Sequence, residues 1–171
     1  MSADAEALFA DHYQPLFRYL CRAVGQADDA QELAQDVFLR ISRTVVPEAS
    51  RAELRAWLFR IARNLVIDYH RSRQRTPRSV ASAVEPERPP SQDVVAAVNE
   101  ALAALGDVDR DVFLMREVAG LGYDEIAKAC DLTPDAVRSR IHRTRLRLRA
   151  DLAAPIATHR TSTMRQSGRR Q

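Results

Sequence analysis

Residues 122–149 read Gly-Tyr-Asp-Glu-Ile-Ala-Lys-Ala-Cys-Asp-Leu-Thr-Pro-Asp-Ala-Val-Arg-Ser-Arg-Ile-His-Arg-Thr-Arg-Leu-Arg-Leu-Arg, a short helical pattern followed by a longer one. Thr133 suits the N-cap of the second helix, and Pro134 suits its first position because proline has no backbone N–H to leave unpaired there. Asp131 falls in the turn, where Asp tolerates the left-handed conformation. The stretch therefore predicts a helix-turn-helix, a motif whose second helix reads the major groove of DNA.

The second helix of this motif has one apolar stripe and one polar, basic face. At helical spacing the stripe, expected to pack inward, contains Val137, Ile141, Thr144 and Leu148. Recognition helices read bases with residues of their first turns. We therefore expect base contacts from Arg138, Ser139, His142 and Arg143. His142 has an alternative interpretation as a solvent-facing residue without a base contact.

Arginines further along the same helix are candidates for phosphate contacts. They are Arg145, Arg147 and Arg149. For the last two, an exposed helix end whose cations favour the C-terminal dipole is an equally good interpretation.

The net charge of +3 is the sum of four blocks of opposite sign. Residues 1–59 hold 6 basic and 9 acidic side chains, and residues 60–80 hold 6 and 1. Residues 81–135 hold 4 and 12, and residues 136–171 hold 10 and 1. Two basic segments separated by an acidic one favour two contacts with a polyanion, although a solvated helix face would explain either segment alone.

The composition favours an all-α fold of two small helical bundle domains joined by a flexible linker. Hydrophobic residues make up 46% of the chain, and only five residues are glycine. The pattern divides into domains at 1–75 and 93–153, a proline-rich linker at 76–92, and a basic tail at 154–171 that we expect to be disordered. Fully extended, the linker spans roughly 55 to 60 Å, so the two domains together could reach DNA elements about two helical turns apart.

No apolar run approaches the roughly 20 residues that span a bilayer, and the acidic N-terminus is unlike a signal peptide. The expectation is a cytoplasmic protein without membrane insertion. The chain has no nucleophile, histidine and carboxylate cluster, no glycine-rich phosphate loop and no set of metal ligands. We expect neither enzymatic activity nor a cofactor. Asp28 and Asp29 fit a helix start better than a metal site. Cys21 and Cys130 fit small buried residues, and their redox role is left open.

Both halves of the chain resemble one family. Residues 109–117, 120–127 and 137–143 resemble the fourth conserved region of the extracytoplasmic-function sigma factors of bacterial RNA polymerase. Residues 28–40 and 55–64, followed by Asp68-Tyr-His-Arg71, resemble the second region of the same family. A helix-turn-helix alone is common, whereas both regions in this order across a linker are specific to sigma factors. The helix-turn-helix would then recognise the minus-35 promoter element.

The resemblance implies that the helix over residues 28–44 docks on the clamp helices of the largest catalytic subunit of core RNA polymerase. The candidate contacts are Gln35, Asp36, Leu39 and Arg43. The apolar pattern of the same helix consists of Leu33, Val37, Leu39 and Ile41, so Leu39 is also expected on its apolar face. An ordinary bundle helix with a solvated acidic face is the alternative.

The resemblance also implies that the helix from Trp57 to Arg75 meets the minus-10 element, where the DNA is opened. The candidate contacts are Arg60, Arg63, Asn64, Asp68 and Arg71. Trp57 and Phe59 could stack on bases, but aromatic residues at helical spacing are more often core. The loop over residues 45–50 has no aromatic residue, in contrast to many relatives.

The function implied is that of a promoter-specificity subunit, whose partners are core RNA polymerase, promoter DNA and an anti-sigma factor. A stand-alone helix-turn-helix regulator and a sigma mimic that sequesters an anti-sigma factor are the alternatives. The regulator would need a sensing or dimerising domain, and the mimic usually carries a receiver domain. Neither pattern occurs in this sequence.

Overall fold

The computed structural model describes the backbone of residues 3–44, 49–75 and 90–166, and the side chains of residues 10–44, 49–75 and 94–153. Within these ranges the chain forms helices and no strands. In chain order the helices are α1 (Ala3–Val24), α2 (Ala27–Ser42), α3 (Arg51–Arg75), α4 (Pro90–Ala103), α5 (Asp107–Glu117), α6 (Tyr123–Cys130) and α7 (Pro134–Gln166). The expected all-α fold is confirmed.

The first three helices form an N-terminal bundle. Gly25 ends α1 in a left-handed conformation with φ of +78°, which glycine adopts without steric cost, and the chain turns directly into α2. Ser50 and Glu53 form a reciprocal capping pair at the start of α3: the Ser50 N–H donates to Glu53 Oε2, and the Glu53 N–H donates to Ser50 Oγ. The buried faces of α1, α2 and α3 then meet around Tyr19, Val37 and Phe59.

The remaining helices form a C-terminal bundle that contains the helix-turn-helix of α6 and α7. Asp131 ends α6 with φ of 55° and ψ of 47°, the left-handed conformation expected at this turn. The Ala136 N–H donates to Thr133 Oγ1 at 3.2 Å, so Thr133 is the N-cap of α7, as predicted. The apolar stripe of α7 is buried, as predicted, at Val137, Ile141, Thr144 and Leu148.

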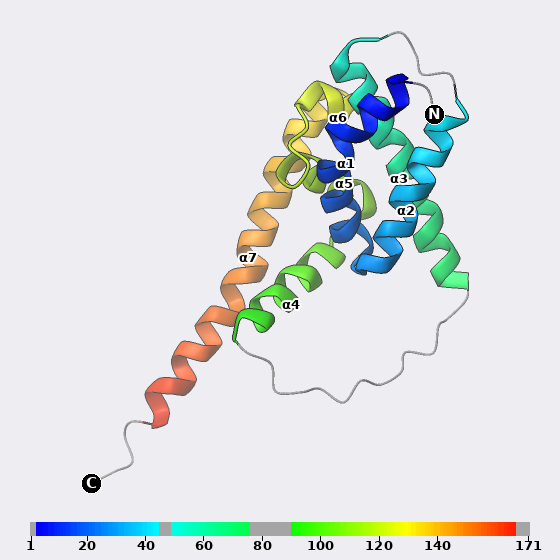
Figure 1. Ribbon diagram of the computed structural model, residues 1–171. Helices are drawn as coiled ribbons and strands as arrows, with labels where there is room; N and C mark the ends of the chain where they lie inside the picture. Colours follow the sequence, from blue (N-terminus) through cyan, green and yellow to red (C-terminus); the bar gives the residue numbers. More distant parts are fainter. Residues whose placement is uncertain (1–2, 45–48, 76–89, 167–171) are drawn as a thin grey trace.

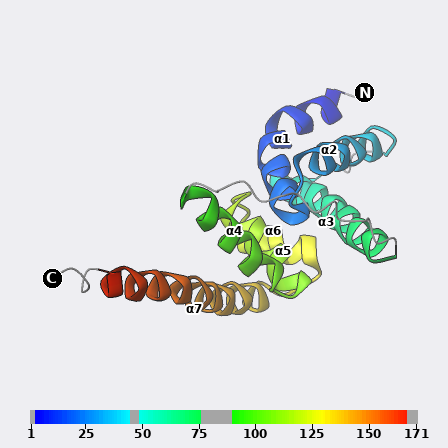
Figure 2. The same ribbon diagram turned by 90° about the horizontal axis from the view of Figure 1, so that it is seen from below.

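The two bundles pack against each other and share one hydrophobic core cluster. The main contact is between α3 and α6, and α1 also contacts α5. Figures 1 and 2 show α5 and α6 between the N-terminal bundle and the long helix α7, whose C-terminal part extends away from the body of the molecule. Two bundles were expected from the sequence, but the contact between them was not.

Three local features differ from the sequence-based expectations. The linker was drawn to residue 92, but α4 begins at Pro90, because proline is well suited to the first turn of a helix. The tail from Ala154 was expected to be disordered, whereas α7 continues to Gln166 even though Pro155 lies within it. Leu39 was placed on the apolar face of α2, but its side chain is 49% exposed. Most of the linker lies outside the described residues.

Candidate nucleic-acid interface

The outward face of the recognition helix α7 is accessible. Ser139, His142 and Arg143 are exposed, and no hydrogen bond or ion pair to another described residue involves their side chains. Arg138 is also exposed, and its guanidinium contacts Asp135 at 2.5 Å. Three of the four candidate base contacts therefore have their polar groups unengaged, and the fourth is held by a neighbour on its own helix.

Three other arginines on α7 tie the helix to its own bundle. Arg140 pairs with Asp109 of α5 at 2.6 Å, and Arg145 pairs with Glu117 at 2.5 Å. Arg147 donates to the backbone carbonyl of Ala104. Arg145, a candidate phosphate contact, thus has a carboxylate partner that DNA would have to replace.

The candidate polymerase contacts on α2 form one exposed face. Gln35, Asp36, Leu39 and Arg43 are all exposed, and they lie at spacings of three to four residues or next to one another. The opposite side of α2 is buried at Leu33, Val37 and Ile41. An apolar side chain left exposed among polar ones is the composition found at protein–protein contacts.

The candidate minus-10 contacts on α3 fall into two groups. Asn64, Asp68 and Arg71 are exposed on the part of α3 that continues beyond α6. Arg60 and Arg63 instead face the C-terminal bundle, where Arg60 pairs with Asp131 and Arg63 pairs with Asp111. The structure therefore brings the first three together at the surface and engages the other two in contacts within the chain. Phe59 is fully buried and is therefore a core residue rather than a surface for stacking on bases. Trp57 is half-buried.

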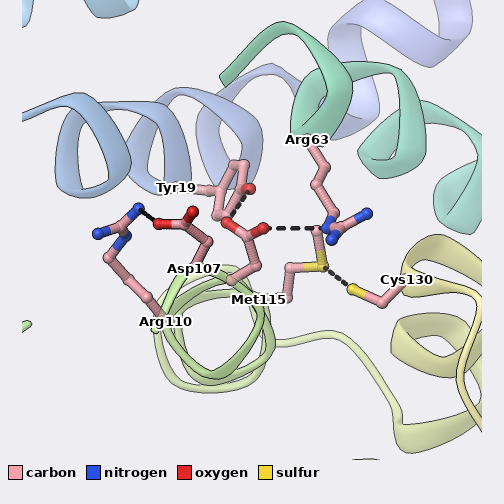
Figure 3. Close-up of polar contacts among 7 residues, drawn as sticks. Tyr19, Arg63, Asp107, Arg110, Met115 and Cys130 are labelled. Atoms are coloured by element: carbon pink, nitrogen blue, oxygen red, sulfur yellow. Dashed lines mark hydrogen bonds and ion pairs between the residues drawn. The ribbon is translucent and has the colours of Figure 1, made fainter. Parts of the chain in front are cut away.

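Asp111 is the centre of the contact between the bundles. Its side chain is 2% exposed and accepts two hydrogen bonds from the N-terminal bundle, from Tyr19 Oη at 3.0 Å and from Arg63 Nε at 3.0 Å. Figure 3 shows both donors pointing toward α5. Burial raises the pKa of the Asp111 carboxyl, and the nearby guanidinium of Arg63 opposes that rise. The Tyr19 phenol, also buried, has its pKa raised well above the ordinary value.

Further polar contacts surround Asp111 at the same interface. Arg55 donates to the carbonyl of Ala119 and lies 3.7 Å from Glu125. Lys128 of α6 donates to Glu53 of α3 at 2.9 Å. Most of the cations come from α3, and most of the carboxylates come from residues 81–135. Two of these cations, Arg60 and Arg63, belong to the basic block 60–80, and their partners Asp131 and Asp111 belong to the acidic block 81–135.

This interface was not predicted from the sequence, although one signal was present. Asp111 lies on the same helical face as Leu114 and Met115, three and four residues later, and both are buried. An acid on an apolar helix face needs a partner, because an unpaired buried charge is costly. That argument predicts a cation near Asp111 but does not say which one.

A groove between α2 and α3 links the two candidate surfaces of the N-terminal bundle. It has a volume of about 520 Å³, and Asp36 and Asp68 both line it. On its wall, the Tyr69 hydroxyl and Arg73 both donate to Asp29, and the Arg73 guanidinium lies 5.3 Å from the ring centroid of Tyr69. The start of α2 is thereby fastened to the end of α3.

Within the described residues, no group of three or more His, Cys, Asp or Glu side chains could hold a metal ion. Asp28 and Asp29 lie in the first turn of α2. Cys130 is buried, and desolvation raises the pKa of its thiol to about 12. It is therefore a neutral thiol, and it donates to Met115 Sδ at 3.8 Å. None of the helices in the described part of the chain is long and apolar enough to cross a membrane.

Comparison with known families agrees with the division into two bundles. Residues 8–76 match the family described as Sigma-70 region 2, and residues 96–148 match Sigma-70, region 4. Together these matches cover all three candidate surfaces described above.

Individual proteins are similar over most of the chain. The ECF RNA polymerase sigma factor SigL of Mycobacterium tuberculosis is 31% identical over 80% of this chain and 81% of its own length. The RNA polymerase sigma factor YlaC of Bacillus subtilis is 27% identical over 86% of this chain and 91% of its own length. Among solved structures, CnrH in complex with the cytosolic domain of CnrY has a TM-score of 0.67 and 27% identity, and the match covers 88% of both chains.

Replacing Asp111 is expected to loosen the contact between the bundles. In Asp111→Asn the Arg63 guanidinium, 16% exposed, loses its counter-charge, and breaking a buried pair costs about 3 to 5 kcal/mol. We expect a larger radius of gyration in small-angle X-ray scattering of the purified chain. Asp107→Asn is the matched control, because Asp107 is on the same helix but, among the described residues, pairs only with Arg110 of its own bundle. Equal radii for the two variants would contradict the role of Asp111.

The pKa of Glu53 also reports on the contact between the two bundles. Its pKa is lowered from the ordinary value of 4.5 to about 2, first by the hydrogen bond from Lys128 and then by those from Ser50. The stabilisation is complete above pH 4.5 and is lost as the pH falls through the range from 4.5 to about 2. In an NMR titration we expect Lys128→Ala to raise the pKa of Glu53 and Arg138→Ala to leave it unchanged. An unaltered Glu53 pKa in Lys128→Ala would mean that the bundles do not meet here in solution.

Proposed function

We propose that this chain, which belongs to the extracytoplasmic-function sigma factors of bacterial RNA polymerase, directs core polymerase to promoters by contacting one promoter element with each helical bundle. The observation that carries the proposal is that one chain has both an accessible recognition-helix face on α7 and an exposed, partly apolar face on α2. A stand-alone regulator needs the first face only. The chain is proposed to act by binding, without catalysing a reaction.

The minus-35 element is the proposed target of α7. Arg138, Ser139, His142 and Arg143 lie in its first turns and would reach base edges, and Arg145 would reach a phosphate after leaving Glu117. The minus-10 element is the proposed target of α3. Asn64 and Asp68 lie one turn apart, so both side chains can face the same strand, with Arg71 close by for a phosphate.

The face made by Gln35, Asp36, Leu39 and Arg43 is proposed to dock on the clamp helices of the largest polymerase subunit. Leu39 supplies the apolar centre of this face, and the three polar side chains surround it. Such an arrangement matches the apolar core and polar rim of protein interfaces. The remaining proposed partner is an anti-sigma factor, supported by the solved complex of the similar protein CnrH with the cytosolic domain of CnrY.

Use of two promoter elements requires the bundles to separate. Two turns of duplex DNA measure roughly 68 Å. In this structure, which we call the closed arrangement, α3 and α6 are in direct contact. Opening also frees Arg60 and Arg63, which the interface engages. We propose that docking on polymerase provides the free energy for this change, and that the chain alone binds DNA weakly.

The proposed division of labour follows the domains expected from the sequence. Residues 1–75 would dock on polymerase and meet the minus-10 element, and residues 93–153 would meet the minus-35 element. Residues 76–92 would join them, and residues 154–171 would form a basic extension. The proposed location is the cytoplasm, where a promoter-directed polymerase works.

Leu39→Ala is expected to weaken binding to core polymerase about tenfold, because a central apolar contact typically contributes 1 to 2 kcal/mol, about a tenfold change in affinity. Leu146→Ala is the matched control, since Leu146 is a leucine of similar exposure, 52%, on α7. Affinity for core enzyme without DNA can be measured by fluorescence titration. The docking assignment is wrong if both variants lose the same affinity.

Run-off transcription with core polymerase tests the function itself. We expect the added chain to start transcripts at promoters that core polymerase alone ignores. Arg143→Ala should reduce the output of promoters that depend on the minus-35 element, and Asn64→Ala should act at the minus-10 element. A chain that binds DNA tightly without polymerase and never supports initiation is not a sigma factor. Unchanged promoter preference in both variants contradicts only the residue assignments.

A further inference from the structure

Tyr123, the first residue of α6, lies close to two guanidinium groups. The Cζ atom of Arg116 is 4.7 Å from the centroid of its ring, and the Cζ atom of Arg138 is 5.3 Å from the same point. Arg116 comes from the last turn of α5, and Arg138 comes from the second turn of α7. Both distances are within the range of cation–π attraction. The ring therefore joins three helices at the outer edge of the helix-turn-helix.

The ring is itself held in place. It is partly buried and packs against the hydrophobic core. Arg116 donates from Nη1 to the carbonyl of Leu121 at 2.8 Å, which fastens this arginine to the turn just before Tyr123. At the same turn the Gly122 N–H donates to Glu125 and fixes the start of α6. Tyr123 is thus a fixed surface rather than a mobile side chain.

Arg138 has a second contact that limits its motion further. Its Nη1 donates to Asp135 Oδ1 at 2.5 Å, one helical turn earlier. No other described residue accepts a hydrogen bond from its Nε or Nη2. The ring on one side and the carboxylate at one nitrogen restrain the guanidinium, and its remaining donors are available. Arg143 differs, because no hydrogen bond, ion pair or ring contact with any described residue restrains its guanidinium.

A restrained guanidinium suits one base in particular. Guanine presents two acceptors, O6 and N7, in the major groove, and arginine pairs with both at once. Restraining the side chain beforehand reduces the rotamer entropy lost when that pair forms. Asp135 has an opposite effect on general affinity: it is 91% exposed, and its negative charge on the DNA-facing helix repels phosphates of any sequence.

We propose that Tyr123 and Asp135 are positioning residues that set Arg138 to read a guanine in the minus-35 element. The inference rests on the proposed function of the helix-turn-helix and adds to it which arginine selects a base, which base it selects, and what holds it ready. The negative charge of Asp135 lowers the affinity of α7 for DNA of every sequence. Its contact with Arg138 increases the selectivity for DNA that has guanine at the position read by Arg138.

The test uses holoenzyme made from core polymerase and the full chain, with transcripts sequenced from a promoter library in which the minus-35 element is randomised. We expect the wild type to favour guanine at one position and Arg138→Ala to lose that preference. Tyr123→Leu should reduce the guanine preference at the same position about two- to fivefold, the change that corresponds to a cation–π contact of about 0.5 to 1 kcal/mol. Tyr123→Phe keeps the ring and should retain the preference.

Asp135→Asn is an independent variant, because so exposed a side chain contributes little to folding. It should increase transcription from many sequences while decreasing the preference for guanine at the Arg138 position. Tyr69→Leu is the matched control, since Tyr69 also makes a cation–π contact, with Arg73 of the N-terminal bundle. It should leave the minus-35 preference unchanged.

The outcomes separate the inference from the proposed function. If wild-type holoenzyme selects no minus-35 sequence at all, the proposed function of α7 fails. If selection occurs but Arg138→Ala keeps every base preference, or if Tyr123→Leu lowers transcription from all sequences equally, the positioning role is overturned. A loss of transcription in Asp135→Asn without a change in guanine preference overturns it as well.

Discussion

The closed arrangement depends on one buried carboxylate, that of Asp111, which accepts hydrogen bonds from Tyr19 and Arg63 across the contact between the bundles. Neither bundle can satisfy this group alone, because both donors belong to α1 and α3 and the acceptor belongs to α5. A charge left without its partner in a dry interface is strongly unfavourable. The relative placement of the two bundles therefore follows from this carboxylate together with the polar contacts and the shared core around it.

The arginines of α3 and α7 fall into two groups: some form ion pairs within the chain, and others face solvent. On α3, Arg60 and Arg63 face carboxylates of the C-terminal bundle, while Arg71 lies in solvent. On α7, Arg140 fastens the helix to α5, while Arg143 remains exposed. A basic segment in the sequence is thus a mixture of structural and solvent-facing residues, and only packing separates them.

Periodicity and capping were sufficient to predict the helix-turn-helix. The N-cap at Thr133, the left-handed Asp131 and the buried stripe of α7 all follow from local rules that act within a few residues. The contact between the bundles could not be predicted in this way, because Arg63 and Asp111 are far apart in the sequence and surface arginines are common. Leu39 shows the opposite limit: its apolar side chain suggested the core, and only the position of α2 in the bundle shows that it faces outward.

The internal pairing of Arg60 and Arg63 has a consequence for how binding responds to salt. A free arginine that meets a phosphate displaces a condensed cation from DNA, and each such release makes affinity fall more steeply with ionic strength. An arginine that first leaves a carboxylate of its own chain exposes that carboxylate, which then takes up a cation from solution. With the minus-10 contacts proposed for Arg60 and Arg63, uptake and release would offset each other at these two positions. The salt dependence of promoter binding is therefore set by the arginines that begin unpaired rather than by all those that end on the phosphate backbone.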